Sequence, residues 1–222
     1  MSISIIIPTL NEEESIGILL QQLQDYRKQG HEIIVVDGGS KDKTISISNS
    51  LADIVIKSQP GRAHQMNKGA AHSSFDVLWF LHADTLVPDK SVENIEQAIH
   101  RYDWGRFNIT LSGKNVLFRI IEKMINIRSC MTGIATGDQG IFVKRQSFET
   151  VGGYFELPLM EDVELCKKLK VLSKPTCLKD ELITSSRRWE KKGIFPTVLL
   201  MWKLRFLYWI GVSADRLATQ YQ

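Results

Sequence analysis

The sequence predicts an α/β domain with a mostly parallel central sheet, helices on its faces and a helical extension at the C-terminus. Short apolar runs alternate with helical stretches through the first half, as in successive βαβ units. The 222 residues, 43% hydrophobic and 24% charged, suit one domain with a substantial core. The aromatic-rich stretch 194–212 follows the alternating part and predicts the extension.

Predicted strands and helices alternate from the N-terminus. The first strand, "ISIIIP", runs into "TLNEEE", where Asn11 and Glu14 predict a capping box before a helix over 15–29. The next elements are a strand in "HEIIVVDGGS", a helix over 43–51, a strand in "ADIVIKS", a helix over 63–71 and a strand in "VLWFLHAD". Continuous apolar strands of this kind are typical of parallel sheets that are buried on both faces.

The second half is less regular. "GRFNITL" and "GDQGIFVKR" predict strands that add to the sheet in antiparallel fashion, with a helix over 116–127 between them. A helix over 161–172 opens with acidic residues, which suit the positive end of its dipole. We predict a main domain over residues 1–192 and a C-terminal helical extension over 193–222.

Composition and charge exclude several classes of protein. A net charge of +3, without a basic stretch interleaved with aromatic residues, argues against a nucleic-acid partner. Cys130, Cys166 and Cys177 lack metal-ligand spacing and predict simple packing in a reducing compartment. The N-terminus lacks the basic region of a signal peptide. We therefore expect a cytoplasmic protein.

The stretch 194–212 is the one candidate for membrane contact. Pro196, Lys203 and Arg205 interrupt it, whereas a spanning helix needs about 20 predominantly apolar residues. Two alternatives remain. The helix lies on the inner face of the cell membrane with its tryptophans near the head groups, or it packs on the domain or on a second subunit as a homodimer contact.

Polar side chains follow each of the first four predicted strands. In strand order they are Thr9, Asn11 and Glu12, then Asp37, then Arg62, and finally His82 with Asp84. In an open parallel sheet, ligands bind beyond the carboxyl ends of the strands, so these groups predict one shared site. Each also has a simpler explanation: Asn11 or Asp84 could cap a helix, and Asp37 could hold a turn.

The type of ligand is constrained as well. No Gly-rich phosphate loop follows any strand, and the acidic run after the first strand would repel a phosphate. Carboxylates suit the base and the ribose of a nucleotide, so its phosphates would need a metal. Asp84 offers a hard oxygen ligand to Mn²⁺ or Mg²⁺, which typically takes one or two carboxylates plus substrate phosphates.

Seven motifs over roughly residues 3–189 resemble, in this order, family 2 glycosyltransferases with the GT-A fold: "IIIPTLNEE", "VVDGGSKDKT", "GRAHQMNKGA", "FLHADT", "GDQGIF", "LMEDVELCKKL" and "SSRRW". The resemblance is to compact bacterial members without large transmembrane extensions. It implies a Rossmann-like GT-A fold and transfer of a sugar from a nucleotide-diphosphate donor, UDP-linked in many relatives, to an acceptor hydroxyl on a sugar, a lipid or a small molecule.

The resemblance also assigns residues to the donor. It implies that the nucleotide sugar is held by Pro8, Thr9, Glu12, Asp37, Arg62, His82 and Asp84. Asp84 matches the second aspartate of the Asp-x-Asp motif and is the implied metal ligand. His82 stands where the first aspartate would be, so the motif provides one strong metal ligand instead of two.

Catalytic and acceptor roles come from the last three motifs. The resemblance implies that Asp162 is the base that deprotonates the acceptor and that Glu161 orients the site; the alternative is that both only complement the helix dipole. Arg188 would stabilise the leaving diphosphate, and Trp189 would stack on the acceptor or the sugar. Asp138 would contact the acceptor, or "TGDQG" is only a tight turn.

The expected function is therefore metal-dependent, inverting and non-processive sugar transfer. Ser185 replaces the glutamine that processive relatives carry in "SSRRW", which argues against a polymerase. One alternative is a non-catalytic nucleotide-binding module that acts through a partner or a membrane. Another is a sugar nucleotidyltransferase, although "TLNEEE" lacks the Gly-rich basic loop that those enzymes carry after the first strand.

Overall fold

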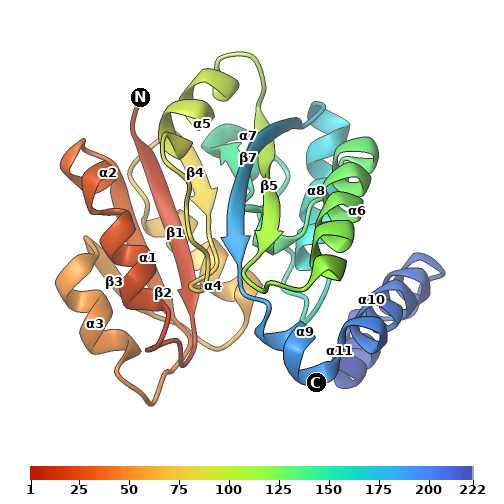
Figure 1. Ribbon diagram of the computed structural model, residues 1–222. Helices are drawn as coiled ribbons and strands as arrows, with labels where there is room; N and C mark the ends of the chain where they lie inside the picture. The colour runs from red at the N-terminus through yellow and green to blue at the C-terminus, as the bar shows by residue number, and fades with distance from the viewer. Residues whose placement is uncertain (222) are drawn as a thin grey trace.

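A computed structural model describes residues 1–221, and a seven-stranded sheet of order β3-β2-β1-β4-β6-β5-β7 forms its centre (Figure 1). The strands are β1 Ile3–Thr9, β2 Glu32–Asp37, β3 Ile54–Lys57, β4 Val77–Phe80, β5 Trp104–Leu111, β6 Phe142–Lys144 and β7 Thr176–Thr184. β6 pairs antiparallel with both β4 and β5, and every other pairing is parallel. The predicted α/β class with a mostly parallel sheet is confirmed.

Helices cover both faces of this sheet. They are α1 Ile16–Gln22, α2 Gln24–Lys28, α3 Thr44–Leu51, α4 Arg62–His72, α5 Ser91–Ile99, α6 Val116–Thr132, α7 Arg145–Thr150, α8 Glu161–Leu172, α9 Arg187–Lys192, α10 Ile194–Trp209 and α11 Ala214–Tyr221. Alternate strand residues point to opposite faces. Ile5 therefore packs with α1, α2 and α5, whereas Ile6 packs with α4, α7 and α8. The residues of β1, β2 and β4 are buried on both faces, which explains the continuous apolar strands.

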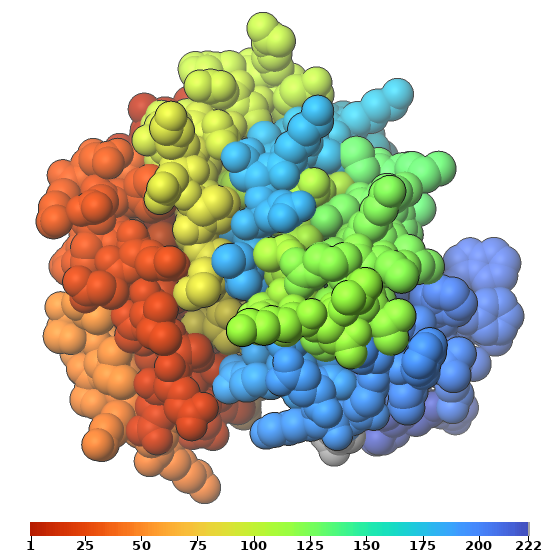
Figure 2. Space-filling view, in the orientation of Figure 1, coloured from red at the N-terminus to blue at the C-terminus, as the bar shows by residue number. Residues whose placement is uncertain are grey.

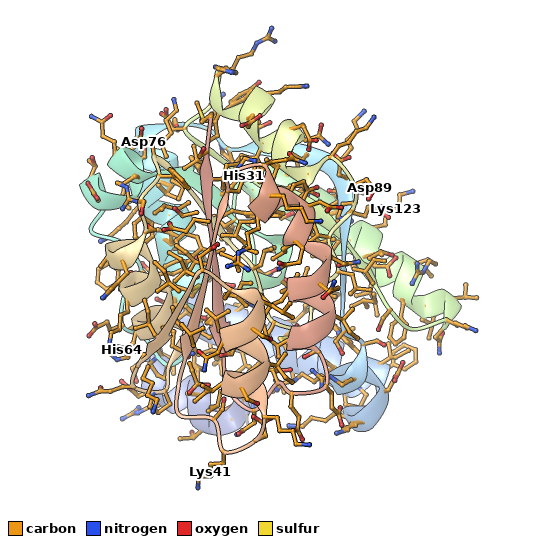
Figure 3. All side chains as sticks on the ribbon, turned by 90° about the vertical axis from the view of Figure 1, so that its left-hand side faces the viewer. His31, Lys41, His64, Asp76, Asp89 and Lys123 are labelled. Carbon is orange, nitrogen blue, oxygen red and sulfur yellow. A yellow bond between two sulfur atoms is a disulfide. The ribbon has the colours of Figure 1, made fainter. Side chains whose placement is uncertain are left out.

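The carboxyl ends of the parallel strands face the lower edge of the molecule. Figure 3 shows His31, just before β2, toward the top and Lys41, just after β2, at the bottom. α9 and α11 lie at this lower edge in Figure 1, and α10 runs beside α11 at the lower right. Leu204 of α10 and Leu217 of α11 pack with Met160 and Val163 at the start of α8. The C-terminal helices thus sit beside the edge where the predicted site residues emerge.

The structure corrects the start of the first helix. The predicted helix over 15–29 is divided at Leu23 into α1 and α2, and the predicted capping box is wrong. Asn11 has a left-handed φ of 54°, and its side chain accepts a hydrogen bond from the Lys41 amide at 2.9 Å. Asparagine tolerates this conformation, so Asn11 joins the loops after β1 and β2 instead of capping α1.

Two of the three cysteines do not simply pack. Cys130 of α6 and Cys177 of β7 form a disulfide with a Cα–Cα distance of 5.9 Å, whereas Cys166 is a buried free thiol. Simple packing is therefore wrong for the first two and correct for Cys166. The pair lies 47 residues apart in sequence and meets because α6 packs against β5, which pairs with β7. Within residues 1–221, none of the helices has both the length and the apolar content to cross a membrane.

Candidate functional site

A cavity of about 1390 Å³ lies at the carboxyl edge of the sheet, between the strand ends and α6, α8, α9 and α10. Figure 2 shows the surface hollowed at its lower edge, between the red segments that follow β1 and the blue C-terminal helices. The structure brings together, around this one cavity, every predicted site residue except Asp37: Pro8, Thr9, Glu12, Arg62, His82, Asp84, Asp138, Glu161, Asp162, Arg188 and Trp189.

The floor of the cavity is fixed by a residue that the sequence did not single out. The Gln65 side chain of α4 is buried and donates to the carbonyls of Thr9 at 2.8 Å and Val36 at 2.7 Å. α4 can lie this close because Gly69 faces the sheet, where a Cβ would come within 2.4 Å of Ile6. One amide therefore holds the ends of β1 and β2 together.

Asp37 holds a turn instead of lining the cavity. Its side chain is fully buried, and Oδ2 accepts hydrogen bonds from the amides of Gly39 at 2.8 Å and Ser40 at 2.9 Å. The other oxygen, Oδ1, has no protein partner. The turn role is thus present in the structure, and the contact between Asp37 and a nucleotide base stays a prediction.

The carboxylates of Glu12 and Asp84 both contact the guanidinium of Arg187. Arg187 Nη2 lies 3.1 Å from Glu12 Oε2 and 3.5 Å from Asp84 Oδ2. Burial, and then the charge of Glu12, raise the pKa of Asp84, while Arg187 opposes the shift. The cap alternative for Asp84 is wrong, because α5 begins at Ser91. Sequence reasoning missed Arg187 and chose its neighbour in "SSRRW".

This convergence tests whether a divalent ion fits. Two hard carboxylate oxygens, from Glu12 and Asp84, already point at one positive group, and such oxygens are the ligands that Mg²⁺ and Mn²⁺ prefer. In the part of the chain that the structure describes, no group of three or more His, Cys, Asp or Glu side chains is placed to hold a metal. The residues fit an ion whose remaining ligands come from substrate phosphates and water.

A second acidic group lies at the start of α8. Asp162 Oδ2 accepts a hydrogen bond from the Gly137 amide at 2.9 Å, and Oδ1 accepts one from the Val163 amide at 2.7 Å. Burial, and then the charge of Asp162, raise the pKa of Glu161 to about 7. Burial alone would lower the pKa of Arg62, but the charges of Glu161 and the neighbouring acids raise the pKa of Arg62 overall. Arg62 is exposed to solvent where it lines the cavity, so its charge is available to a ligand.

His82 and Asp138 add polar atoms without protein partners. Burial, and then the charge of Arg62, lower the pKa of His82 to about 3, so its ring is neutral. His82 Nε2 has no partner and lies against Gly137, where a Cβ would come within 2.6 Å of it. Asp138 Oδ1 is also unpartnered, and burial raises the pKa of this side chain. Buried polar atoms are normally hydrogen-bonded, so these two indicate positions that a ligand would satisfy.

Arg188 and Trp189 line the cavity from α9. The Arg188 guanidinium lies 3.5 Å from the centre of the Tyr221 ring and donates to the Tyr221 carbonyl. Trp189 packs against the apolar cluster of Leu111, Phe118 and Ile121. In this arrangement the arginine beside Glu12 and Asp84 is Arg187, while Arg188 is engaged with α11. The predicted roles of Arg188 with the diphosphate and of Trp189 with the acceptor stay predictions.

Comparison with known proteins identifies relatives of this site. The sequence model "Glycosyl transferase family 2" matches residues 4–110. A probable glycosyltransferase of Bacillus subtilis, YdaM, is 29% identical over 196 residues. That alignment takes in 73% of this chain but 45% of YdaM, so the chain spans less than half the length of this relative.

Solved structures share the fold. TarS 1-349 from S. aureus, crystallised with UDP-GlcNAc, superposes with a TM-score of 0.65 at 20% identity, over 83% of this chain and 58% of that one. The mannosyltransferase PcManGT from Pyrobaculum calidifontis, in complex with GDP-Man and Mn²⁺, gives a TM-score of 0.64 at 20% identity, over 82% and 56%. At this identity the likeness establishes the fold, with its sheet and flanking helices.

Proposed function

We propose that this chain is a family 2 glycosyltransferase that moves a sugar from a nucleotide-diphosphate sugar, UDP-linked, to an acceptor hydroxyl. The observation that carries the proposal is that one cavity is shared by two groups of polar residues. It joins the donor-side groups at the ends of β1 and β4 to Asp162 at the start of α8, so that a donor and a base can meet. Solved relatives of the same fold hold UDP-GlcNAc, or GDP-Man with Mn²⁺.

The donor occupies the polar part of the cavity in this proposal. Thr9 and Glu12 contact the nucleoside, with Pro8 packing beside it, and Asp37 contacts the base if the turn after β2 opens. The Oγ1 atom of Thr9 is buried without a partner, which supports a ligand at this position. A divalent cation, Mn²⁺ or Mg²⁺, held by Asp84 and Glu12, supplies positive charge for the diphosphate.

Asp162 acts as the general base. Two backbone amides orient its carboxylate toward the cavity, so its position does not depend on the substrate. It takes the proton of the acceptor hydroxyl as that oxygen bonds to the anomeric carbon, and direct displacement inverts the configuration there. Such assistance contributes about 10²–10⁴-fold to the rate. Glu161, close to half-protonated near pH 7, limits the negative charge beside the base.

Two arginines serve the leaving group. Arg187 lies between Glu12 and Asp84, the residues that would hold the ion, so its guanidinium is placed within reach of a diphosphate bound there. Arg188 joins it after leaving Tyr221, and positive charge at developing negative charge is often the largest catalytic contribution. Trp189 and Asp138 would then bound the acceptor side of the cavity.

The substitution Asp162→Asn tests this assignment. We expect sugar transfer and slow donor hydrolysis to fall at least about 100-fold, because the variant lacks the base. Binding of UDP with Mn²⁺, measured by thermal shift, should stay within twofold of wild type. Asp215→Asn, on the first turn of α11, is a matched control that should change neither quantity.

Near-normal turnover of Asp162→Asn would show that another group is the base. If wild-type protein bound UDP but never released it from a UDP-sugar, the chain would instead be a non-catalytic nucleotide-binding module.

A further inference from the structure

The cavity has an apolar part that the polar donor does not use. Side chains of α6 and α10 wall it, among them Ile120, Met124, Phe195, Leu199 and Trp202. These five residues are called the apolar arm. It adjoins the proposed base, because Val163, next to Asp162, packs against Leu204 of α10. A ligand in the apolar arm is therefore continuous with the place where the acceptor hydroxyl must lie.

The apolar arm opens onto the surface. Its side chains are exposed by between 49% for Met124 and 69% for Phe195, although they also line the cavity. Along α10 the exposed residues Phe195, Leu199, Trp202, Phe206 and Trp209 recur at steps of four and three, which places them on one helix face. This face is called the α10 stripe. A row of five exposed large apolar side chains on one helix face marks an interaction site.

The charges around this surface indicate what covers it. Apart from the two arginines assigned to the diphosphate, the basic residues between 189 and 205 are Lys191, Lys192, Lys203 and Arg205, against the single acid Glu190. Lys123 of α6, next in sequence to Met124, is exposed and lies at the outer surface in Figure 3. Anionic lipid head groups complement such a rim, with tryptophans at the interface. A second copy of the chain would instead bring a rim of the same sign of charge toward this one.

We propose that the acceptor is a membrane lipid whose hydrocarbon chain lies in the apolar arm while the α10 stripe rests on an anionic membrane surface. This inference rests on the proposed sugar transfer and adds the class of acceptor. The head-group hydroxyl oxygen bonds to the anomeric carbon of the sugar as the bond from that carbon to the diphosphate oxygen breaks. Asp162 receives the hydroxyl proton, and the nucleoside diphosphate leaves with the electron pair.

A series of alkyl glucosides tests the apolar arm directly. Methyl, butyl, hexyl and octyl β-glucoside, each below its micelle concentration, are titrated into protein saturated with UDP and Mn²⁺. Each methylene that enters the apolar arm should tighten binding about fourfold. Leu199→Glu should flatten this dependence on chain length, while Val171→Glu, at a more exposed site on α8, should leave it unchanged. Equal affinities along the series in wild type would overturn the proposal.

Vesicle sedimentation tests the α10 stripe. Wild-type protein should bind vesicles of phosphatidylcholine with phosphatidylglycerol, and bind vesicles of phosphatidylcholine alone more weakly. The double variant Phe206→Glu/Trp209→Glu changes residues outside the cavity and should bind the mixed vesicles at least about tenfold more weakly. Val171→Glu again serves as the control, and unchanged UDP-dependent thermal shifts confirm that each variant is folded.

The outcomes separate the two proposals. If wild-type protein shows the UDP-dependent thermal shift but binds neither the glucosides nor the vesicles, the lipid-acceptor proposal is refuted and the transferase proposal stands. If no nucleotide produces a thermal shift, the proposed sugar transfer itself is refuted. A concentration-dependent dimer that Phe206→Glu dissociates, without vesicle binding, would assign the α10 stripe to a second copy and overturn the membrane contact.

Discussion

The pKa of Glu161 should appear in the stability of the protein. Burial, and then the charge of Asp162, raise this pKa from 4.5 to about 7, so the folded state resists ionising this side chain. Below pH 4.5 the carboxyl is protonated in the folded and unfolded states and costs nothing. As the pH rises to about 7, the folded protein holds a proton that the unfolded chain has lost, and the free energy of unfolding falls.

The size of the effect follows from the shift. A pKa shift from 4.5 to about 7 corresponds to about 3 kcal/mol at 1.36 kcal/mol per unit. Glu161→Gln cannot ionise and should escape this loss. Urea unfolding of both proteins between pH 4.5 and 8 should show the variant gaining up to about 3 kcal/mol on wild type over the window, with little further change above it.

Glu164→Gln on the same helix provides the control. Burial opposes the shift, but hydrogen bonds from Lys167 and Tyr208 lower the pKa of Glu164 overall. The stabilisation by ionised Glu164 is fully present above its unfolded pKa and is lost only as the pH falls through its folded pKa. From pH 5 upward, the free energy of unfolding of this variant should therefore differ from that of wild type by a constant amount. A difference between Glu161→Gln and wild type that stays constant with pH would refute the reasoning about burial.

Three further changes test the site and the packing around it. Asp84→Ala should remove the Mn²⁺-dependent part of the UDP thermal shift while keeping any metal-independent part, and an undiminished metal effect would exclude Asp84 as a ligand. Leu204→Ala should lower the free energy of unfolding by about 2–5 kcal/mol in urea titrations, since Leu204 is fully buried between α8, α10 and α11. Cys130→Ser should cost about 2–4 kcal/mol, and reduction should destabilise wild type equally but leave the variant unaffected.

Local pattern was sufficient to predict the strands at the centre of the sheet. β1, β2 and β4 are buried on both faces, so each is a continuous apolar run between turn signals. β7 was not predicted, because this edge strand carries Lys179, Asp180 and Glu181 in its middle and buries little. β7 is a strand because its backbone hydrogen-bonds to β5, and the local amino-acid composition of β7 does not reveal that pairing.

The candidate site divides in the same way. Thr9, Glu12 and Asp84 could be predicted because each follows a recognisable strand, and the topology of a parallel sheet then places them together. Gln65 and Arg187 could not be predicted. Gln65 acts on carbonyls that lie 29 and 56 residues away, and Arg187 acts on carboxylates 103 and 175 residues away. Contacts over such separations depend on the completed fold.

The Gln65 bridge has a consequence for how the site comes into existence during folding. Three segments must all be in place before both of its hydrogen bonds can form, namely β1, β2 and α4. We therefore expect the floor of the cavity to assemble in one cooperative step, because an intermediate without α4 would lack both hydrogen bonds of Gln65. Amide hydrogen exchange along α4 should then slow when nucleotide binds, because ligand and helix stabilise the same unit.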